Sequence, residues 1–158
     1  MLDVLERFSR FKLPIHFTEN NLISGQLMPP DIVDLNDYQV DEWPSTEEGE
    51  IRQAKEVEHM YRILFENSNV EAITSWDYMD GLWLNAPAGF LRTDDTIKPS
   101  YEALDKLINK EWKTNLELTT DEEGYVEFEG FKGNYEITLK GNNVTLELNE
   151  DTKKKINI

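Results

Sequence analysis

Apolar residues recur along the first two thirds of the chain in two different patterns, helical spacing and short continuous runs. Helical spacing holds near the N-terminus, at Val4, Leu5, Phe8 and Phe11, and again in a longer amphipathic stripe: Ile51, Ala54, Glu58, Tyr61, Leu64 and Phe65. A short, mostly apolar run follows each helical segment, at 13–17 and at 70–74. A third helix is predicted from about 100 to 112. This order predicts two strands, at about 14–19 and 71–76, that are parallel and joined by a right-handed helical crossover.

Both predicted strands end in residues that can do chemistry. The first stops at the carboxylate of Glu19, and the second ends at Trp76 and leads into a loop with Asp80 and Trp83. In a (β/α)8 barrel, catalytic residues sit at the carboxyl ends of the strands. The alternative for Glu19 is an acidic residue that only opens a loop, and the alternative for the two tryptophans is core filling. His16 is expected to point to the helix layer, because side chains alternate along a strand.

After Thr114 the pattern changes from helical to alternating. Four short antiparallel strands are predicted, at 116–118, 125–128, 135–139 and 144–148, with turns at 121–124, 130–134 and 140–143. The chain therefore divides into residues 1–114 and a small β module at 115–158. This module is near the lower size limit for an independent core, so its expected role is to pack against the first part. Sugar binding through Tyr125, Phe131 or Tyr135 is the second interpretation.

The order and spacing of these motifs resemble the C-terminal part of a glycoside hydrolase family ten enzyme, an endo-1,4-β-xylanase. Ile15, Thr18 and Glu19 match the Ile-x-x-Thr-Glu of the seventh barrel strand of that family, in which the Glu is the nucleophile. The family's eighth strand carries a Trp, an Asp and a second Trp, matched by three residues, Trp76, Asp80 and Trp83. The segments 88–92 and 98–104 match the way many members enter their last helix. The resemblance covers residues 1–114 and implies the last two strands and flanking helices of a (β/α)8 barrel, an α/β fold.

The chain departs from this family in three respects. Asn20-Asn21 stands where many members have Leu-Asp, and Asp77 stands where many have Gly. The third departure concerns the acid/base, which in the family is a Glu that follows an Asn on the fourth strand. Retaining hydrolysis needs two carboxyl groups about 5–5.5 Å apart, and the sequence supplies only Glu19. Asn149-Glu150 has the right letters, but it lies in a charged tail and is a chance match.

The amino-acid composition argues against several classes of binding partner and of chemistry. With 16 basic and 32 acidic residues, the net charge of −16 argues against nucleic acid and against anionic membranes. The absence of cysteine excludes a disulfide framework and thiolate chemistry. The N-terminus does not have the apolar core of a signal peptide, since charged residues interrupt it. The acidic loop at 20–50 resembles a calcium site in its carboxylates, but it lacks the EF-hand pattern. We expect no metal and no cofactor.

Two functions follow from these observations. The first is a portion of a retaining endo-β-1,4-xylanase that carries the nucleophile Glu19 and lacks the acid/base, and is therefore inactive alone. Trp76, Asp80 and Trp83 would bind the substrate, β-1,4-linked xylan or a related plant polysaccharide. The second is a non-catalytic carbohydrate-associated or structural remnant. The resemblance implies an extracellular or cell-envelope location, and open sheet edges predict self-association.

Overall fold

The computed structural model describes residues 1–150 and 155. The chain divides into two compact units, Met1–Leu107 and Ile108–Ile158. The sequence placed the boundary later, between 114 and 115. The difference arises within the last helical segment, because Leu107 is buried whereas the next residue, Ile108, is exposed. Among the described residues, no helix is long and apolar enough to cross a membrane.

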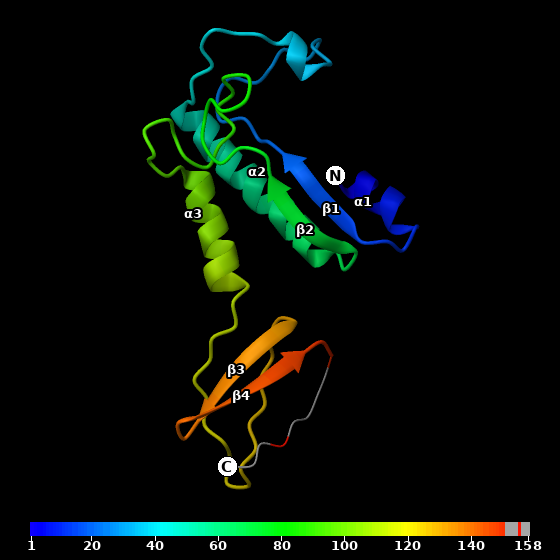
Figure 1. Ribbon diagram of the computed structural model, residues 1–158, viewed down its shortest axis with the longest axis vertical. Coiled ribbons are helices and arrows are strands. Elements are labelled where there is room, and N and C mark those ends of the chain that lie inside the picture. The colour runs from blue at the N-terminus through cyan, green and yellow to red at the C-terminus, as the bar shows by residue number, and fades with distance from the viewer. Residues whose placement is uncertain (151–154, 156–158) are drawn as a thin grey trace. The chain divides into compact units, whose positions relative to one another are not determined.

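The first unit is built on a pair of parallel strands (Figure 1). Helix α1 (Leu2–Ser9) leads into β1 (Ile15–Asn20), and a long loop with one 3₁₀ turn (η1, Leu35–Asp37) leads into α2 (Glu47–Glu66). Strand β2 (Val70–Ser75) then pairs with β1 in parallel, from Ile15 opposite Val70 to Asn20 opposite Ser75. This confirms the predicted parallel pair with a helical crossover. The assignment of these strands to the last two of a (β/α)8 barrel stays a prediction, because within the described chain this sheet has two strands and no barrel is shown.

Helix α2 is the longest element and covers one face of the sheet. Its N-cap is Thr46, whose hydroxyl accepts a hydrogen bond from the Gly49 amide at 3.0 Å, and acidic residues fill the first turn. Its buried apolar face is Val57, Met60, Tyr61 and Leu64. The predicted stripe was therefore only partly right. Tyr61 and Leu64 are buried, but the stripe's two ends, Ile51 and Phe65, are exposed, since the sheet is too small to cover the whole helix.

A segment after β2 leads to α3 (Pro99–Lys106), which packs against α2 and continues as one turn of π-helix (η2, Leu107–Glu111). Proline at the first helical position suits this start, because the missing N–H would have no partner there. The sequence predicted one continuous helix from 100 to 112. In the structure the α-helix ends at Lys106, and the following residues, Leu107–Glu111, form a turn of the wider π-helix.

The second unit contains an antiparallel hairpin of β3 (Gly133–Leu139) and β4 (Asn142–Leu148). Lys140 and Gly141, with φ values of 50° and 83°, form the two-residue turn that right-handed strand twist favours. Two of the four predicted strands are thus confirmed. The predictions at 116–118 and 125–128 were wrong, because neither segment joins a ladder in the described chain. The turn between them does form, with the Asp121 carboxylate accepting hydrogen bonds from the Glu123 and Tyr125 amides.

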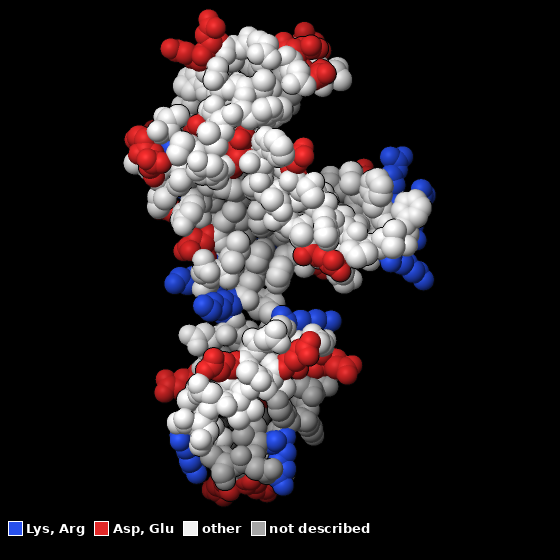
Figure 2. Space-filling view, viewed as in Figure 1, with Lys and Arg blue, Asp and Glu red and all other residues white. Residues whose placement is uncertain are grey.

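Charge is unevenly distributed on the visible face of the first unit. Figure 2 shows basic side chains gathered around α1 and the turn after it, where the sequence has Arg7, Arg10 and Lys12. Acidic side chains form separate patches on the rest of this face.

The open edges of the small parallel sheet lead to a first prediction. Strands of parallel sheets are normally buried on both faces, and unpaired edges recruit further strands. The apolar residues Ile15, Phe17, Ala72 and Ile73, expected to face water, are half-buried, so β1 and β2 are only partly covered. We expect the isolated chain to self-associate at micromolar concentration, as measured by light scattering. Added salt should increase association, since it screens the −16 charge beyond a Debye length of about 8 Å at 0.15 M. A monomer at all salt concentrations, with protected strand amides, would contradict this.

Candidate strand-end site

Two predicted site residues lie side by side at the carboxyl ends of the parallel strands. Glu19 is the second-last residue of β1 and is exposed, and Trp76 directly follows β2 with 53% of its surface exposed. The ladder continues past the strand end, because the Trp76 amide donates to the Asn20 carbonyl at 3.3 Å. The Asn20 side chain adds a hydrogen bond to the Thr74 carbonyl at 2.6 Å. Glu19 and Trp76 are therefore held on adjacent backbones.

Strand alternation puts Trp76 on the face away from α2. Ser75 faces α2, since its hydroxyl lies 3.4 Å from that of Tyr61. Its neighbour Trp76 must then point to the opposite face. Asn20 is the register partner of Ser75, but the ladder is irregular between Phe17 and Asn20, so strand alternation assigns a face to Trp76 and not to Glu19. His16 is exposed, 3.3 Å from the Glu71 carboxylate, which makes it a surface ion-pair partner.

A reciprocal side-chain pair joins the two strand ends just beyond these residues. The Asn21 amide donates to the Asp77 carboxylate at 3.1 Å, and the Asp77 backbone N–H donates to the Asn21 side-chain oxygen at 3.3 Å. Asp77 is only 4% exposed. Burial raises the pKa of Asp77 above its ordinary value of 3.8, against the opposing effect of the hydrogen bond from Asn21, and the nearby Asp80 raises it further. Asp77 is thus a buried acid that the fold holds at an electrostatic cost.

Asp80, predicted to bind substrate, is instead engaged inside the protein. Its Oδ1 accepts hydrogen bonds from Lys98 Nζ at 2.7 Å and from the Gly89 amide at 2.9 Å, and the residue is 8% exposed. These contacts give Asp80 a structural role, and its part in substrate binding stays a prediction. Trp83 is half-buried in the turn at 80–86, where its carbonyl accepts from the Ala86 amide.

Lys98 is the centre of this buried network. The ammonium group is 0% exposed and donates to three groups from separate segments: Ser24 Oγ at 2.8 Å, Asp80 Oδ1 and the Gly89 carbonyl at 3.0 Å. Burial lowers the pKa of Lys98, while Asp80 acts in the other direction. A serine beside a lysine can form a nucleophilic dyad. Here Ser24 is also 0% exposed and bonds the Pro87 carbonyl, so substrate has no access to this pair.

A second layer of polar contacts surrounds Lys98. Arg92 makes a two-pronged contact with the Glu50 carboxylate, and Ser45 donates to the same group at 3.0 Å. Burial raises the pKa of Glu50, but the hydrogen bonds from Arg92 and Ser45 and the nearby positive charges outweigh it and hold the pKa below its ordinary value. Gln53 of α2 bonds the Leu22 and Gly89 carbonyls and accepts from Ser100. The loops after β1 and β2 are thus fastened to α2 and α3.

The long loop before α2 forms a small core of its own. Trp43 is buried with Ala86 and Ala88, and its ring meets Tyr38 edge-on at 4.8 Å between centroids. Sequence reasoning considered this loop for its carboxylates, and its buried aromatic residue was not recognised. The described residues contain no group of three or more His, Cys, Asp or Glu side chains arranged to hold a metal ion.

Sequence reasoning also missed the buried polar residues: Ser24, Glu50, Gln53, Lys98 and Ser100. Lys98-Pro99 was noticed only as part of a resemblance. A usable signal for one of them was Pro99, which predicts the start of a helix and thereby places Lys98 at its N-cap. Nothing local in the sequence distinguishes a buried lysine from an exposed one.

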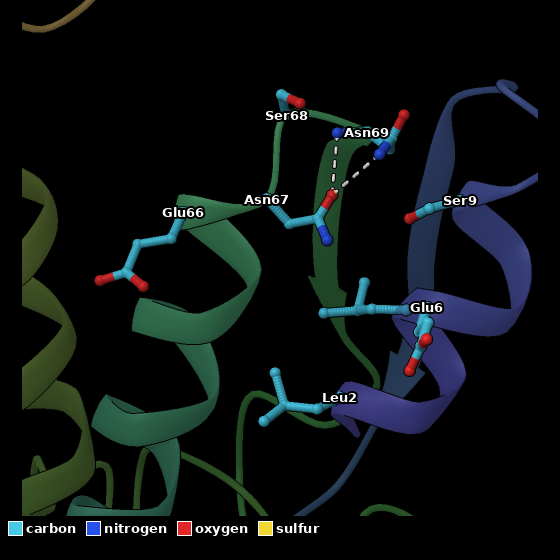
Figure 3. A pocket seen from close by; sticks show the side chains of 8 residues that line it. Leu2, Glu6, Ser9, Glu66, Asn67, Ser68 and Asn69 are labelled. Atoms are coloured by element: carbon cyan, nitrogen blue, oxygen red, sulfur yellow. Dashed lines mark hydrogen bonds between the residues drawn. The ribbon is translucent and has the colours of Figure 1, made fainter.

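A pocket of about 540 Å³ lies at the other end of the strands (Figure 3). It is lined by α1 and by the turn from α2 to β2, including Leu5, Glu6, Ser9 and Glu66. Within the turn, Asn67 Oδ1 accepts from the backbone and side-chain nitrogens of Asn69. This pocket borders the amino end of β2, so it is separate from the strand-end site of Glu19 and Trp76.

No protein-family model matches the chain. The chain is similar to the anti-sigma-I factor RsgI6 of Acetivibrio thermocellus, with 31% identity over 137 residues. This match covers 83% of the chain but 18% of the relative, so the chain spans less than a fifth of the length of that protein.

Among solved structures, the chain is similar to xylanase 10B from Thermotoga petrophila RKU-1, which was crystallised with xylobiose. The TM-score is 0.49 and the identity 22%, over 68% of this chain and 30% of that one. A likeness of this size does not establish a common reaction, nor a complete barrel. The mixed α/β character of the chain follows from its own strands and helices.

The raised pKa of Asp77 gives a second prediction. A carboxyl group with a raised pKa in the folded state loses its proton more easily in the unfolded state, so its ionisation costs stability. This loss of stability is absent when the pH is below 3.8, the ordinary pKa of the group. It grows as the pH rises and is complete when the pH exceeds the raised pKa of Asp77 in the folded state. Asp77→Asn should therefore increase the free energy of unfolding at pH 7 relative to the wild type, and this gain should vanish near pH 3. Urea unfolding at both pH values measures it, and an equal effect at both would contradict it.

The Lys98 ammonium gives a third prediction. Lys98→Met leaves the Asp80 carboxylate buried without its cation, and breaking a buried pair in this way costs about 3–5 kcal/mol. The matched control is Lys55→Met, at an exposed lysine of α2, which should change the free energy of unfolding by less than about 0.5 kcal/mol. Adding Asp80→Leu to Lys98→Met should recover part of the loss, since it removes the unpaired charge. Urea unfolding of the four proteins decides this, and equal losses for Lys98→Met and Lys55→Met would contradict it.

Proposed function

We propose that this chain carries the nucleophile of a retaining endo-β-1,4-xylanase-type site, with Glu19 as the nucleophile and Trp76 as a sugar-stacking platform. The observation that supports this most is the placement of two exposed side chains on adjacent carboxyl ends of parallel strands. The substrate class rests on the motif shared with the family ten xylanases, Ile15-x-x-Thr18-Glu19.

The chemistry follows from these two groups. An ionised Glu19 attacks the anomeric carbon; the bond from this carbon to the leaving-group oxygen breaks, and a glycosyl–protein ester forms. The indole of Trp76 offers a large, rigid apolar surface for the C–H face of a sugar ring. Exposure suits both roles, because a substrate can reach the carboxylate and the ring is free to receive a ligand.

The same site lacks a free acid for the leaving group. Of the neighbouring carboxyl groups, that of Asp77 is buried against Asn21, and that of Asp80 is paired with Lys98. Neither carboxyl group can turn toward a ligand at the strand ends without breaking these contacts. In this proposal the acid/base belongs to another part of a longer protein, and the chain alone does not hydrolyse xylan.

A second candidate function is that of a carbohydrate-associated, non-catalytic part of a larger protein. The curated relative favours it, since its name describes an anti-sigma factor and no hydrolase. The same exposed Trp76 would then hold a polysaccharide chain that is bound but not cleaved. The two candidates differ in one respect, the nucleophilic reactivity of Glu19.

A fourth prediction separates them. A 2,4-dinitrophenyl 2-fluoro-β-xylobioside has a leaving group that needs no protonation, so a nucleophile alone can react with it. We expect slow release of dinitrophenolate and a mass increase of one fluoroxylobiosyl group on the peptide that contains Glu19. Glu19→Gln should abolish the adduct, whereas Trp76→Ala should slow its formation and Trp112→Ala, in the second unit, should leave it unchanged.

Three outcomes are informative. Labelling of Glu19 supports the nucleophile assignment. Binding of xylo-oligosaccharides without labelling removes the enzymatic proposal and favours the second candidate. Turnover of unactivated xylan by the chain alone would show that an acid is present after all, and Asp77→Asn and Asp80→Asn would then identify it.

A further inference from the structure

The two positions at which the chain departs most locally from the xylanase pattern contact each other. Asn21 stands where many members have Asp, and Asp77 stands where many have Gly. The two residues are 56 apart in sequence, yet they exchange two hydrogen bonds across the strand ends. Asp77, which carries the carboxylate, follows β2, and Asn21, which carries the amide, follows β1. A single altered residue would have left a polar group unpaired, whereas these two satisfy each other.

The pair Asn21–Asp77 lies where it can hold the ends of β1 and β2 together. The parallel ladder is irregular between Phe17 and Asn20, so the regular pairing of backbones does not fix the end of β1, where Glu19 lies. Beyond the irregularity, the strand ends are joined by the Asn20 contacts and by the pair Asn21–Asp77. Each member of the pair lies within two residues of a predicted site residue, Glu19 on one strand and Trp76 on the other.

The geometry of the pair restrains both strands at once. Asn21 uses its nitrogen on the carboxylate and its oxygen on the backbone N–H of Asp77, so neither group can rotate without losing a bond. Asp77 is almost fully buried, and a buried polar group that loses its partner is costly. The pair therefore favours one relative position of the two backbones over small slips along the strand direction.

We propose that Asn21 and Asp77 are positioning residues that hold Glu19 and Trp76 at a fixed separation, so that a sugar stacked on Trp76 presents its anomeric carbon to Glu19. The inference rests on the proposed function for its ligand, but the positioning itself is measured without any ligand. The proposal gives neither residue a contact with the substrate, because Asp77 is buried and the Asn21 amide is committed to it.

The test uses a charge exchange within the pair, in the full chain. Asn21→Asp places two carboxylates together and removes the donor, so it should disturb the strand ends. Adding Asp77→Asn restores both hydrogen bonds in mirrored form: the new side-chain amide at position 77 donates its nitrogen, and the new carboxylate at position 21 accepts from it and from the backbone N–H. Asp31→Ala, at an exposed acid of the long loop, is the matched control.

The readout is the amide spectrum of ¹⁵N-labelled protein, which shows the backbone N–H of Glu19 and the four indole N–H groups of the chain. We expect Asn21→Asp to shift or broaden the signals of Glu19 and Trp76 and the double variant to restore them. The indole signal of Trp43, whose Nε1 donates to the Gln26 carbonyl within the loop core, should stay unchanged throughout. Affinity for xylotriose, followed at the Trp76 signal, should fall about tenfold in Asn21→Asp and return in the double variant.

The outcomes keep the two proposals apart. Unchanged Glu19 and Trp76 signals in Asn21→Asp, or no recovery in the double variant, overturn the positioning role. A disturbance that also reaches Trp43 overturns it too, since the pair would then support the whole unit. Loss and recovery of the signals without any xylotriose binding in the wild type leave the positioning standing and remove the proposed substrate.

Discussion

The buried ammonium group of Lys98 is the interaction on which the first unit depends. It joins the segment after β1, through Ser24, to the segment after β2, through Asp80 and Gly89. A lysine enters the interior at a large desolvation cost, which is offset only when its donors are all satisfied and an opposite charge is near. Here all three donors have acceptors, and Asp80 is the opposite charge. The two long loops must therefore come together at one place and in one arrangement.

This polar centre compensates for a modest apolar core. Within the described chain, apolar burial is concentrated in two groups, one under α2 (Val57, Met60, Tyr61 and Leu64) and one under the loop of Trp43. Many large apolar side chains stay exposed, among them Phe8, Phe11 and Leu13 around the first turn. Hydrogen bonds add little net energy each, but leaving any of these buried groups without a partner is expensive. The network therefore specifies loop geometry more than it adds stability.

The same arrangement explains why the strand ends are the chemically interesting place. The loops after both strands are held against the helical segments by hydrogen bonds from Lys98, Gln53 and Arg92. Glu19 and Trp76 remain at the strand ends with their side chains exposed. The nearby carboxyl groups are engaged in contacts of the same kind, Asp77 with Asn21 and Asp80 with Lys98. A site with one free carboxylate and one free indole suits covalent attack or sugar binding, and it lacks the second acid that complete hydrolysis needs.

The sequence by itself determined the local elements and the residues at the strand ends. Helical spacing and the two apolar runs are properties of neighbouring residues, and they predicted α2, β1, β2 and the parallel pairing. The candidate role of Glu19 came from the resemblance of its motif to that of the family ten xylanases. Only the tertiary structure decided that Asp80 is an ion-pair partner, that Trp43 fills a core and that Asn21 meets Asp77. Each of these depends on partners 18 to 56 residues away in the sequence or on burial between segments, which spacing along the chain does not encode. The predicted strands at 116–118 and 125–128 failed for the same reason, because alternation gives a segment the capacity to be a strand, and only a partner for its backbone N–H and C=O groups makes it one.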